Sequence, residues 1–375
     1  MTTTTTESAP ASAFAVISVA CLMSSCVFRS EDVAVNEEPG ITPGALTTVS
    51  PPSTVFPQIH TNLSGMVTEF VRVMHQDKRG NHWFGTNTNG LICYDGTALR
   101  KVAIEGLPPR ASVRNIVEDR VGNVWFGTSE GLVRHDGREF TLFSEAHGLQ
   151  DEEVWGMTVD ARGVVWVGST GGVSHFDGEK FRPFALPETK VVNPRSMISD
   201  KLVLDFMEDR NGTMWIVTDG NGIFQYREGV FAHLTSQNGL IDDSATGVLQ
   251  DRQGHIWIGT FHGGVSRFDG KTFANFTRDG VIDGEEVGSF LEDSQGNVWF
   301  SAENHGVYRY DGTQFTRFTT ADGLTSNLVL SMCEDSEGRI WLGSWQGLCI
   351  YDGEQFVNAK DKAHWTDRRH EQRPR

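Results

Sequence analysis

The sequence predicts an all-β protein, a seven-bladed β-propeller with four antiparallel strands in each blade. One motif recurs seven times between residues 60 and 356. Most copies are about 42 residues apart, a period that is typical of propeller blades. No segment shows the sustained 3.6-residue apolar period of an amphipathic helix. These three observations favour propeller blades over the stacked helices of a solenoid.

The motif runs Asp-x-x-Gly-x-x-Trp, is usually followed by Gly-Thr or Gly-Ser, and is completed by a further Gly and an Asp-Gly pair. Its first members, here called the turn aspartates, are Asp77, Asp119, Asp160, Asp209, Asp251, Asp293 and Asp335. The tryptophans are Trp83, Trp125, Trp166, Trp215, Trp257, Trp299 and Trp341. The longest interval, between the third and fourth turn aspartates, indicates an insertion over Val191–Leu202 in blade four.

Each repeat divides into four strands, as the sixth repeat shows. The expected strands are Val287–Leu291, Val298–Phe300, Gly306–Tyr310 and Phe315–Phe318. The polar turn that contains Asp293 separates the first two, and an Asp-Gly pair, a strong hairpin signal, separates the last two.

The repeated residues have structural explanations. An Asp at the start of a turn accepts hydrogen bonds from backbone N–H groups ahead of it, and the turn Gly adopts positive φ. A Trp is large enough to fill the wedge between neighbouring blades. A calcium-binding reading of the turn aspartates is disfavoured because the motif lacks the run of oxygen ligands that a calcium loop needs.

The N-terminal residues predict export. Residues 1–26 resemble a signal peptide, with an apolar run at Ala11–Met23 that is too short to span a bilayer. The segment Leu22-Met23-Ser24-Ser25-Cys26 resembles a lipobox, so Cys26 is the expected lipidation site and the only expected attachment to a membrane. The expected location is therefore periplasmic or at the cell envelope.

The remaining boundaries follow from composition. Residues 27–58, rich in Pro, Thr and acidic residues, predict a disordered tether. Residues 59–358 form the propeller, and 359–375 form a basic tail. Val55–Ile59 also has the pattern of a strand that can extend the last blade, and the sequence leaves open which terminus closes the ring.

Charge and cysteine content exclude several classes of function. The formal net charge of −17 disfavours nucleic-acid binding. The five cysteines form no C-x-x-C pair, so neither a metal site nor a cofactor is predicted. Cys93, Cys333 and Cys349 lie in strand patterns and are expected to be small buried hydrophobic residues.

The repeat resembles the two-component regulator propeller repeat, with clear copies at Asp119–Thr128 and Asp251–Thr260. The resemblance extends over about residues 60–356. It implies a periplasmic sensor of the kind found in hybrid histidine kinases, which often respond to oligosaccharides. No membrane span, kinase core or DNA-binding domain follows the propeller, so the expectation is a chain that needs a partner, such as a membrane sensor kinase or an envelope protein. Val217 and Ser301 replace a Gly that other copies have.

A binding site is expected on the face that carries the loops entering the first strands and the loops joining second to third strands. Acidic residues eight or nine positions before the turn aspartates surround this face in blades three to six: Asp151, Glu152, Asp200, Asp242, Asp243 and Glu285. The loops after the second strands add Phe261, His262, Asn304, His305 and Trp345. Carboxylates and amides beside aromatic rings suit a glycan, and they suit a cation or a basic peptide equally well. Simple solvation of charged loop ends is the alternative.

Three functions remain open at this point. The first is an exported ligand-binding or sensor protein for a glycan or another polar ligand. The second is an envelope scaffold for protein interactions. The third is a propeller polysaccharide lyase or hydrolase, which paired carboxylates or His262 and His305 would serve. No catalytic residue is assigned, because no Ser-His-Asp group, metal spacing or phosphate loop stands out.

Overall fold

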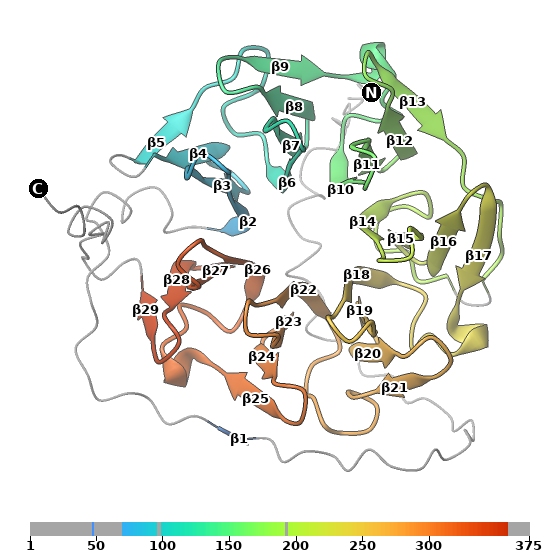
Figure 1. Cartoon of the computed structure of the whole chain (residues 1–375), viewed down its shortest axis with the longest axis vertical. Helices are drawn as coiled ribbons and strands as arrows, with labels where there is room; N and C mark the ends of the chain where they lie inside the picture. Colours follow the sequence, from blue (N-terminus) through green and yellow to red (C-terminus); the bar gives the residue numbers. More distant parts are fainter. Residues whose placement is uncertain (1–46, 49–69, 96–98, 192–193, 359–375) are drawn as a thin grey trace, which may run out of the picture. The chain divides into compact units, whose positions relative to one another are not determined.

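The computed structural model describes residues 47–48, 70–95, 99–191 and 194–358, all of which fall in one compact unit, Pro43–Arg375. Seven antiparallel sheets surround a central axis (Figure 1), and each contains four consecutive strands of the chain. The predicted seven-bladed propeller is confirmed. One sheet has a fifth strand, because β1 (Thr47–Thr48) pairs in parallel with the outer strand of blade six.

The strands follow the same order in every blade, from the axis outward. The inner strands are β2 (Val71–Gln76), β6 (Val113–Glu118), β10 (Val154–Val159), β14 (Val203–Glu208), β18 (Ala245–Gln250), β22 (Val287–Glu292) and β26 (Val329–Glu334). The second strands are β3 (His82–Thr86), β7 (Val124–Thr128), β11 (Val165–Ser169), β15 (Met214–Thr218), β19 (Ile256–Thr260), β23 (Val298–Ala302) and β27 (Ile340–Ser344). The third strands are β4 (Leu91–Tyr94), β8 (Gly131–His135), β12 (Gly172–Phe176), β16 (Ile223–Arg227), β20 (Val265–Phe268), β24 (Gly306–Tyr310) and β28 (Gly347–Tyr351). The outer strands are β5 (Leu99–Val102), β9 (Phe140–Phe143), β13 (Phe181–Phe184), β17 (Val230–Leu234), β21 (Phe273–Asn275), β25 (Phe315–Phe318) and β29 (Phe356–Asn358).

Within the described ranges, three 3-10 helices, each one turn long, follow outer strands: η3 (Glu145–His147), η4 (Ser236–Asn238) and η5 (Thr320–Asp322). In the part of the chain that the structure describes, no helix has the length and apolarity needed to cross a membrane.

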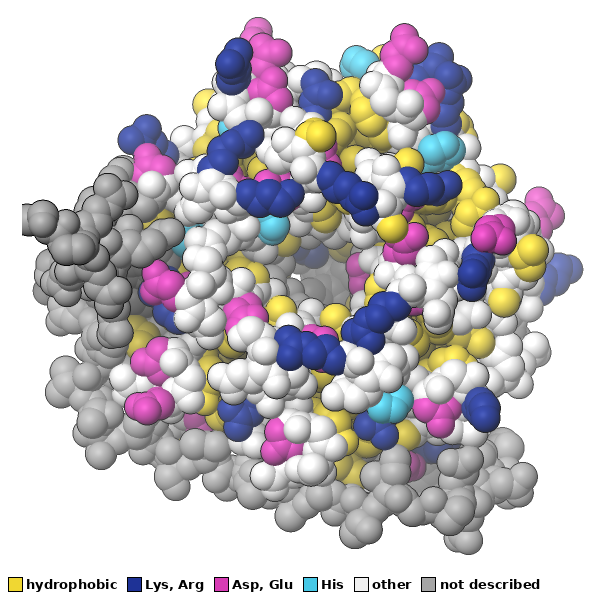
Figure 2. All heavy atoms as spheres, in the orientation of Figure 1, with side chains coloured by type: hydrophobic (Ala, Val, Ile, Leu, Met, Phe, Trp, Pro, Cys, Tyr) yellow, Lys and Arg dark blue, Asp and Glu magenta, His cyan; other side chains and the backbone are white. Residues whose placement is uncertain are grey.

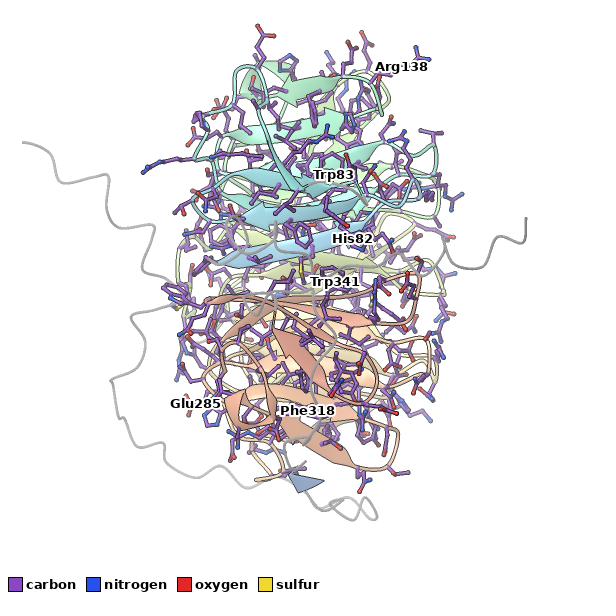
Figure 3. All side chains as sticks on the ribbon, turned by 90° about the vertical axis from the view of Figure 1, so that its left-hand side faces the viewer. His82, Trp83, Arg138, Glu285, Phe318 and Trp341 are labelled. Atoms are coloured by element: carbon purple, nitrogen blue, oxygen red, sulfur yellow. The ribbon has the colours of Figure 1, made fainter. Side chains whose placement is uncertain are left out.

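The second strands carry the core. All five residues of each one are buried, because blades pack against both faces of the sheet. The repeat Trp of one blade lies in the apolar cluster it shares with the next blade, as Trp257 does with Phe300 and Phe315 of blade six. Across the junction of the first and last blades, Trp341 contacts His82 with ring centroids 4.9 Å apart (Figure 3). The predicted wedge role of the Trp is therefore confirmed.

The turn aspartates bond as predicted and also make one contact that the motif alone did not reveal. In blade two, Asp119 Oδ1 accepts the N–H groups of Val121 and Asn123 at 3.1 and 2.8 Å. Its Oδ2 accepts the indole N–H of Trp125 at 3.0 Å. The same indole bond, 2.7 to 3.1 Å long, occurs in all seven blades. Each Asp therefore orients the Trp that packs between blades.

Neighbouring blades are also joined near the turns. The N–H group after a turn aspartate donates to the last side chain of the next inner strand, as Arg252 does to Glu292 at 2.8 Å. On the face that carries these turns, Lys and Arg side chains gather around the central opening (Figure 2). Some of them bond the next turn, as when the Arg252 guanidinium donates to the carbonyl groups of Asp293 and Ser294. In a chain with net charge −17, these basic groups are explained by blade-to-blade contacts.

One junction lacks this bond. Between blades two and three, Val159 occupies the position that holds Glu or Gln in the other six blades, so it cannot accept the N–H of Arg120. A cavity of about 460 Å³ lies here, lined by Arg120 and Val159 together with Phe206 and Glu208.

The ring closes by contact of blade seven with blade one. Blade seven takes all four of its strands from Val329–Asn358. The N–H of Ser336 donates to Gln76 Oε1 at 2.8 Å, and the N–H of Phe70 donates to the carbonyl of Trp345 at 3.2 Å. The predicted strand Val55–Ile59 lies outside the described residues, as do Cys26 and the rest of the predicted signal peptide.

The three described cysteines are free and lie in β4, β26 and β28, as expected. Burial raises the pKa of each thiol to about 12. They are small apolar residues of the core rather than reactive thiols.

Candidate ligand-binding site

The propeller has two different faces. The turn face carries the turn aspartates and the hairpins between third and outer strands. The mouth face carries the loops that enter the inner strands and the turns between second and third strands. Arg138, in the β8–β9 hairpin, and Glu285, just before β22, lie at opposite edges of the side view in Figure 3 and identify the two faces.

Backbone bonds fix the mouth-face loops in a repeated way. The N–H of Phe261, at the end of β19, donates to the carbonyl of Ser244, just before β18, at 2.9 Å. The N–H of Gly264 donates across to the carbonyl of Glu285 in the next blade at 2.7 Å. Equivalent cross-blade bonds reach the carbonyls of Glu152, Asp243 and Asn327. The backbone of the predicted acidic rim therefore joins the blades, and its side chains are free to differ.

The six predicted acidic residues differ in exposure and in hydrogen bonding. Glu152, Asp200 and Glu285 are exposed, and Asp151 Oδ1 is used locally, accepting the N–H of Glu153 at 2.7 Å. Asp243 is buried, because its carboxylate accepts the N–H and hydroxyl of Ser236 at 2.6 and 2.8 Å and so anchors η4. Asp243 therefore supports the loop and presents no side chain to a ligand.

Asp242 lies in a charged cluster with two other groups. Arg195 Nη1 of the blade-four insertion is 3.8 Å from Asp242 Oδ2. Burial raises the pKa of the Asp242 carboxyl, and His262 and Arg195 oppose this shift. The ring of Phe261 is 6.3 Å from that of His262. The structure thus brings together three predicted residues, Asp242, Phe261 and His262.

A buried carboxylate accepts most of the hydrogen bonds that anchor the insertion in blade four. Asp219, in the turn between β15 and β16, accepts backbone N–H groups from Met197, Ile198 and Ser199 and the hydroxyl of Ser196, at 2.7 to 3.3 Å. Gly220 has φ of +84° and passes so close that a Cβ atom there would lie 2.5 Å from the Ser196 nitrogen. Blade four departs from the repeat at this turn because the turn anchors the insertion.

Blade six uses its predicted residues differently. Asn304 is exposed at the β23–β24 turn in a left-handed conformation, with φ of +60°. The carbonyl of His305 accepts a 2.8 Å bond from Arg317 Nε, and Arg317 also pairs with Asp283 at 3.1 Å.

Glu286 follows Glu285 and lies beside Glu303, whose N–H donates to the Glu286 carbonyl at 2.8 Å. Burial, and then the neighbouring Glu303 carboxylate, raise the pKa of Glu286 well above its ordinary value. A protonated carboxyl group can donate a hydrogen bond as well as accept one. This side of the mouth therefore carries polar groups suited to hydroxyl groups.

Trp345 has a contact that the sequence could not assign. Its ring meets that of Phe70 edge-to-face, with centroids 4.3 Å apart. Phe70 precedes β2, and its ring lies 5.6 Å from the guanidinium carbon of Arg72. Trp345 therefore belongs to a row of side chains that leads to the inner strands.

The rest of that row was missed by sequence reasoning. Arg72 of β2 and Arg114 of β6 lie over the ring of Trp155 of β10, with guanidinium carbons 5.5 and 4.0 Å from the ring centroid. Arg114 Nη2 also pairs with Glu153 Oε1 at 2.8 Å, and Arg72 Nη1 donates to Asn87 Oδ1 at 3.2 Å. We call Arg72, Arg114 and Trp155 the mouth cluster.

The mouth cluster is half-buried and only partly paired. The Arg114 side chain is 5% exposed. Its Nε and Nη1 groups and the Trp155 indole nitrogen have no hydrogen-bond partner among the described residues. Burial, followed by repulsion from Arg114, lowers the pKa of Arg72 to about 10.

A signal for the cluster does exist in the repeat alignment. The three residues stand five positions before their turn aspartates, where the other blades have Leu204, Thr246, Gly288 and Leu330. In blades one to three this is the extra residue at a shift in strand register, between Val71 and Val73 for example. A bulge re-aims a side chain away from its ordinary strand position. Two Arg and a Trp at such a position have no role in the repeat itself.

The molecule is therefore a propeller built from repeats, and the residues of the mouth cluster on one of its faces do not follow the repeat. Three segments match the family model for the two-component regulator propeller: residues 106–130, 239–262 and 323–346. The chain therefore carries two-component regulator propeller repeats, as its motif predicted. No curated protein matches the sequence.

Solved structures share the fold at low identity. The extracellular domain of a hybrid two-component system from B. thetaiotaomicron is 20% identical, with a TM-score of 0.62 over 78% of this chain. This chain spans 40% of the length of that domain. Virginiamycin B lyase from Staphylococcus aureus, crystallised with quinupristin, is 15% identical, with a TM-score of 0.60 over 77% of this chain and 96% of the lyase. PorZ, a surface component of the type-IX secretion system of Porphyromonas gingivalis, has a TM-score of 0.59 at 15% identity, over 76% of this chain and 46% of PorZ.

Proposed function

We propose that this chain is an exported, non-catalytic binding propeller of the sensor type, which takes a glycan or similar polar ligand at its mouth face. The mouth cluster carries the proposal. Its two arginines and its tryptophan stand at a position where the other four blades have uncharged, non-aromatic residues, so the architecture does not require them. Aromatic faces stack on the C–H faces of sugars, and fixed donors and acceptors orient hydroxyl groups.

Two further groups border this centre. Phe70 and Trp345 extend the aromatic row toward blade seven, and the Asp242–His262 cluster and Glu286 lie on the mouth face of blades five and six. Sites for small ligands typically combine apolar faces with a few converging polar groups. The resemblance to extracellular domains of two-component systems supports a sensor role, with a membrane sensor kinase or an envelope protein as the partner.

A glycan array probed with the purified full chain tests the proposal. We expect binding of one glycan class, lost in Trp155→Ala and reduced in Trp345→Ala, because both variants remove a ring from the row. The control is Val121→Ala, an exposed substitution on the turn face that is expected to leave binding unchanged. Binding that survives both Trp substitutions in a folded protein would show that the site lies elsewhere.

One observation favours the lyase alternative. Asp242 lies close enough to His262 to interact with it electrostatically, as a carboxylate that orients a catalytic histidine base would. The structural likeness to virginiamycin B lyase extends to the fold alone. Our proposal expects a bound glycan to be released unchanged. Shortened or unsaturated products, lost in His262→Ala or Glu152→Gln, would establish an enzyme instead.

The scaffold alternative makes the opposite prediction for the array. A chain that only joins envelope proteins would bind no glycan, and its partner would be retained equally by the wild type and by Trp155→Ala. Lipidation is tested separately: globomycin should cause precursor to accumulate if Cys26 is lipidated, and substitution of Cys26 should abolish this response to the drug.

A further inference from the structure

We infer that the mouth cluster is a carboxylate-binding site, so that the ligand at this face is an acidic saccharide rather than a neutral one. The inference rests on the proposed function and names the chemical class of its ligand. It is carried by the charges and unpaired donors around Arg72, Arg114 and Trp155.

The cluster holds more positive than negative charge. Two guanidinium groups adjoin one carboxylate, that of Glu153, and the pairing uses only Nη2 of Arg114. Glu130, an exposed residue at the β7–β8 turn, adds a weaker attraction to Arg114. Arg72 has a neutral partner, the amide oxygen of Asn87. Buried charges in proteins are normally paired, because an isolated one loses its hydration without compensation. A bound anion would supply the missing negative charge.

The unpaired donors indicate where that anion binds. Arg114 Nε and Nη1 and Trp155 Nε1 are buried and have no partner in the described part of the chain. The Trp155 ring, 4.0 Å from the guanidinium carbon, holds the guanidinium in place, and Glu153 fixes one of its nitrogens. A guanidinium held in this way presents fixed donors that match the two oxygens of a carboxylate.

Other arginines of the chain show what a structural role looks like here. Arg134, Arg267 and Arg309 occupy the same position of their third strands and stack on the repeat Trp of their own blades. Their recurrence identifies them as part of the blade. Arg72 and Arg114 are on inner strands, next to the axis, at a position where four blades have uncharged residues.

A saccharide is favoured over a small free anion because aromatic rings adjoin the charges. Trp155 and the Phe70–Trp345 pair offer apolar faces beside the guanidinium groups. A uronic acid ring combines a carboxylate with C–H faces and hydroxyl groups, and so it matches both features of the site.

Titration calorimetry on the full chain tests the inference with three probes: a short oligogalacturonate, its methyl ester, and acetate. The ester keeps the sugar rings and removes the charge, and acetate keeps the charge and removes the rings. We expect the acid to bind at least about tenfold more tightly than the ester, with acetate weaker than both, and we expect the affinity for the acid to fall as salt is added.

The variants are Arg114→Gln and Arg72→Gln, with Arg138→Gln on the turn face as the matched control. We expect each mouth variant to lower affinity for the acid at least about tenfold and to leave affinity for the ester unchanged. Arg138→Gln should change neither. Arg114→Lys keeps the charge without the planar fork and should lose part of the affinity. Thermal unfolding confirms that each variant is folded.

The outcomes separate the inference from the proposed function. Equal affinity for the acid and the ester overturns the inference. So does an Arg114→Gln variant that binds the acid as tightly as Arg138→Gln does. If the array then shows a neutral glycan whose binding needs Trp155, the proposed function stands without it. If no array glycan binds and the acid probe does not bind at millimolar concentration, both fail. If acetate binds as tightly as the oligosaccharide, the site takes a small carboxylate and the saccharide assignment is wrong.

Discussion

The turn face and the mouth face are built from the same repeat but differ in what their side chains do. On the turn face, every blade places an Asp where it receives an indole N–H, as Asp119 does from Trp125. On the mouth face the backbone bonds recur, but the side chains differ from blade to blade, from Arg72 in one inner strand to Gly288 in another. Repetition therefore marks residues that are already satisfied by the fold. Residues available for a ligand are found where the repetition stops.

The sharpest way to test this comparison is to break one repeated contact. Asp251→Ala removes a buried carboxylate that binds the Trp257 indole N–H at 2.8 Å and the backbone N–H of His255 at 2.8 Å. We expect a loss of about 3 to 5 kcal/mol of unfolding free energy, because buried donors lose their charged partner. Urea unfolding measures the loss.

Trp257→Phe provides the control, since it keeps most of the ring and removes only the indole donor. The double variant should lose less than the sum of the two single losses, because the two residues share one bond. Losses that simply add would show that the Asp–Trp bond contributes nothing, and that the Asp acts through its turn alone.

On the mouth face, the largest expected stability effect comes from Asp219. Asp219→Ala removes the acceptor for four hydrogen-bond donors of the insertion. Because Ser196 is exposed, some of these donors can then bond to water. We expect a loss of about 2 kcal/mol and faster hydrogen exchange at Met197, Ile198 and Ser199. Asp200→Ala, an exposed change in the same insertion, should alter neither. Unchanged exchange in Asp219→Ala would mean that other contacts hold the insertion.

The pH dependence of stability provides a third test, through Glu286. Its pKa is raised in the folded chain by burial and by Glu303. The native state therefore holds a proton that the unfolded chain releases above about pH 4.5, its ordinary value. Unfolding free energy should fall as pH rises from there toward the raised pKa, by at most about 1.4 kcal/mol per pH unit.

Glu286→Gln should flatten this slope, because the amide does not titrate. The control is Glu285→Gln, the exposed neighbour, which should leave the slope as it is in the wild type. A slope that is equal in all three proteins would show that Glu286 is ionised in the folded state.

The smallest expected change in unfolding free energy comes from restoring the missing hydrogen bond between blades two and three. Val159→Gln restores the acceptor that the other junctions have, and the adjoining cavity leaves space for the longer side chain. We expect a gain of about 0.5 to 1 kcal/mol if Gln accepts the Arg120 N–H, measured by urea unfolding. A loss instead would mean that the contacts of Val159 with the apolar cluster between blades two and three outweigh the hydrogen bond.

The fold could be predicted because each structural residue appears seven times in one chain, so that chance matches at one blade are corrected by the others. The strand limits of repeat six differ from expectation by at most two residues, with β22 ending at Glu292 and β23 at Ala302. The bond between Asp293 and Trp299 could not be predicted, because it depends on how the turn folds the two side chains together.

The mouth was harder to predict for a physical reason. Acidic loop residues such as Asp243 look available in the sequence, but a short loop needs internal acceptors, and this carboxylate serves as one. Arg72 and Arg114 lie within strands, where a residue is expected to face a neighbouring blade. The register shift that turns them toward the axis is a feature of three-dimensional pairing that no single residue encodes.

If the proposed ligand binds at the mouth, the closure of the ring between Phe70 and Trp345 would couple its binding to the mechanical stability of the ring. These two residues join the last described blade to the first, and they also extend the aromatic row of the mouth. A ligand that contacts both sides of this seam binds the closed ring and not the opened one, so its binding energy adds to the work needed to separate the blades. An occupied propeller would then withstand a pulling force applied across the seam longer than an empty one, and its stiffness would report the ligand.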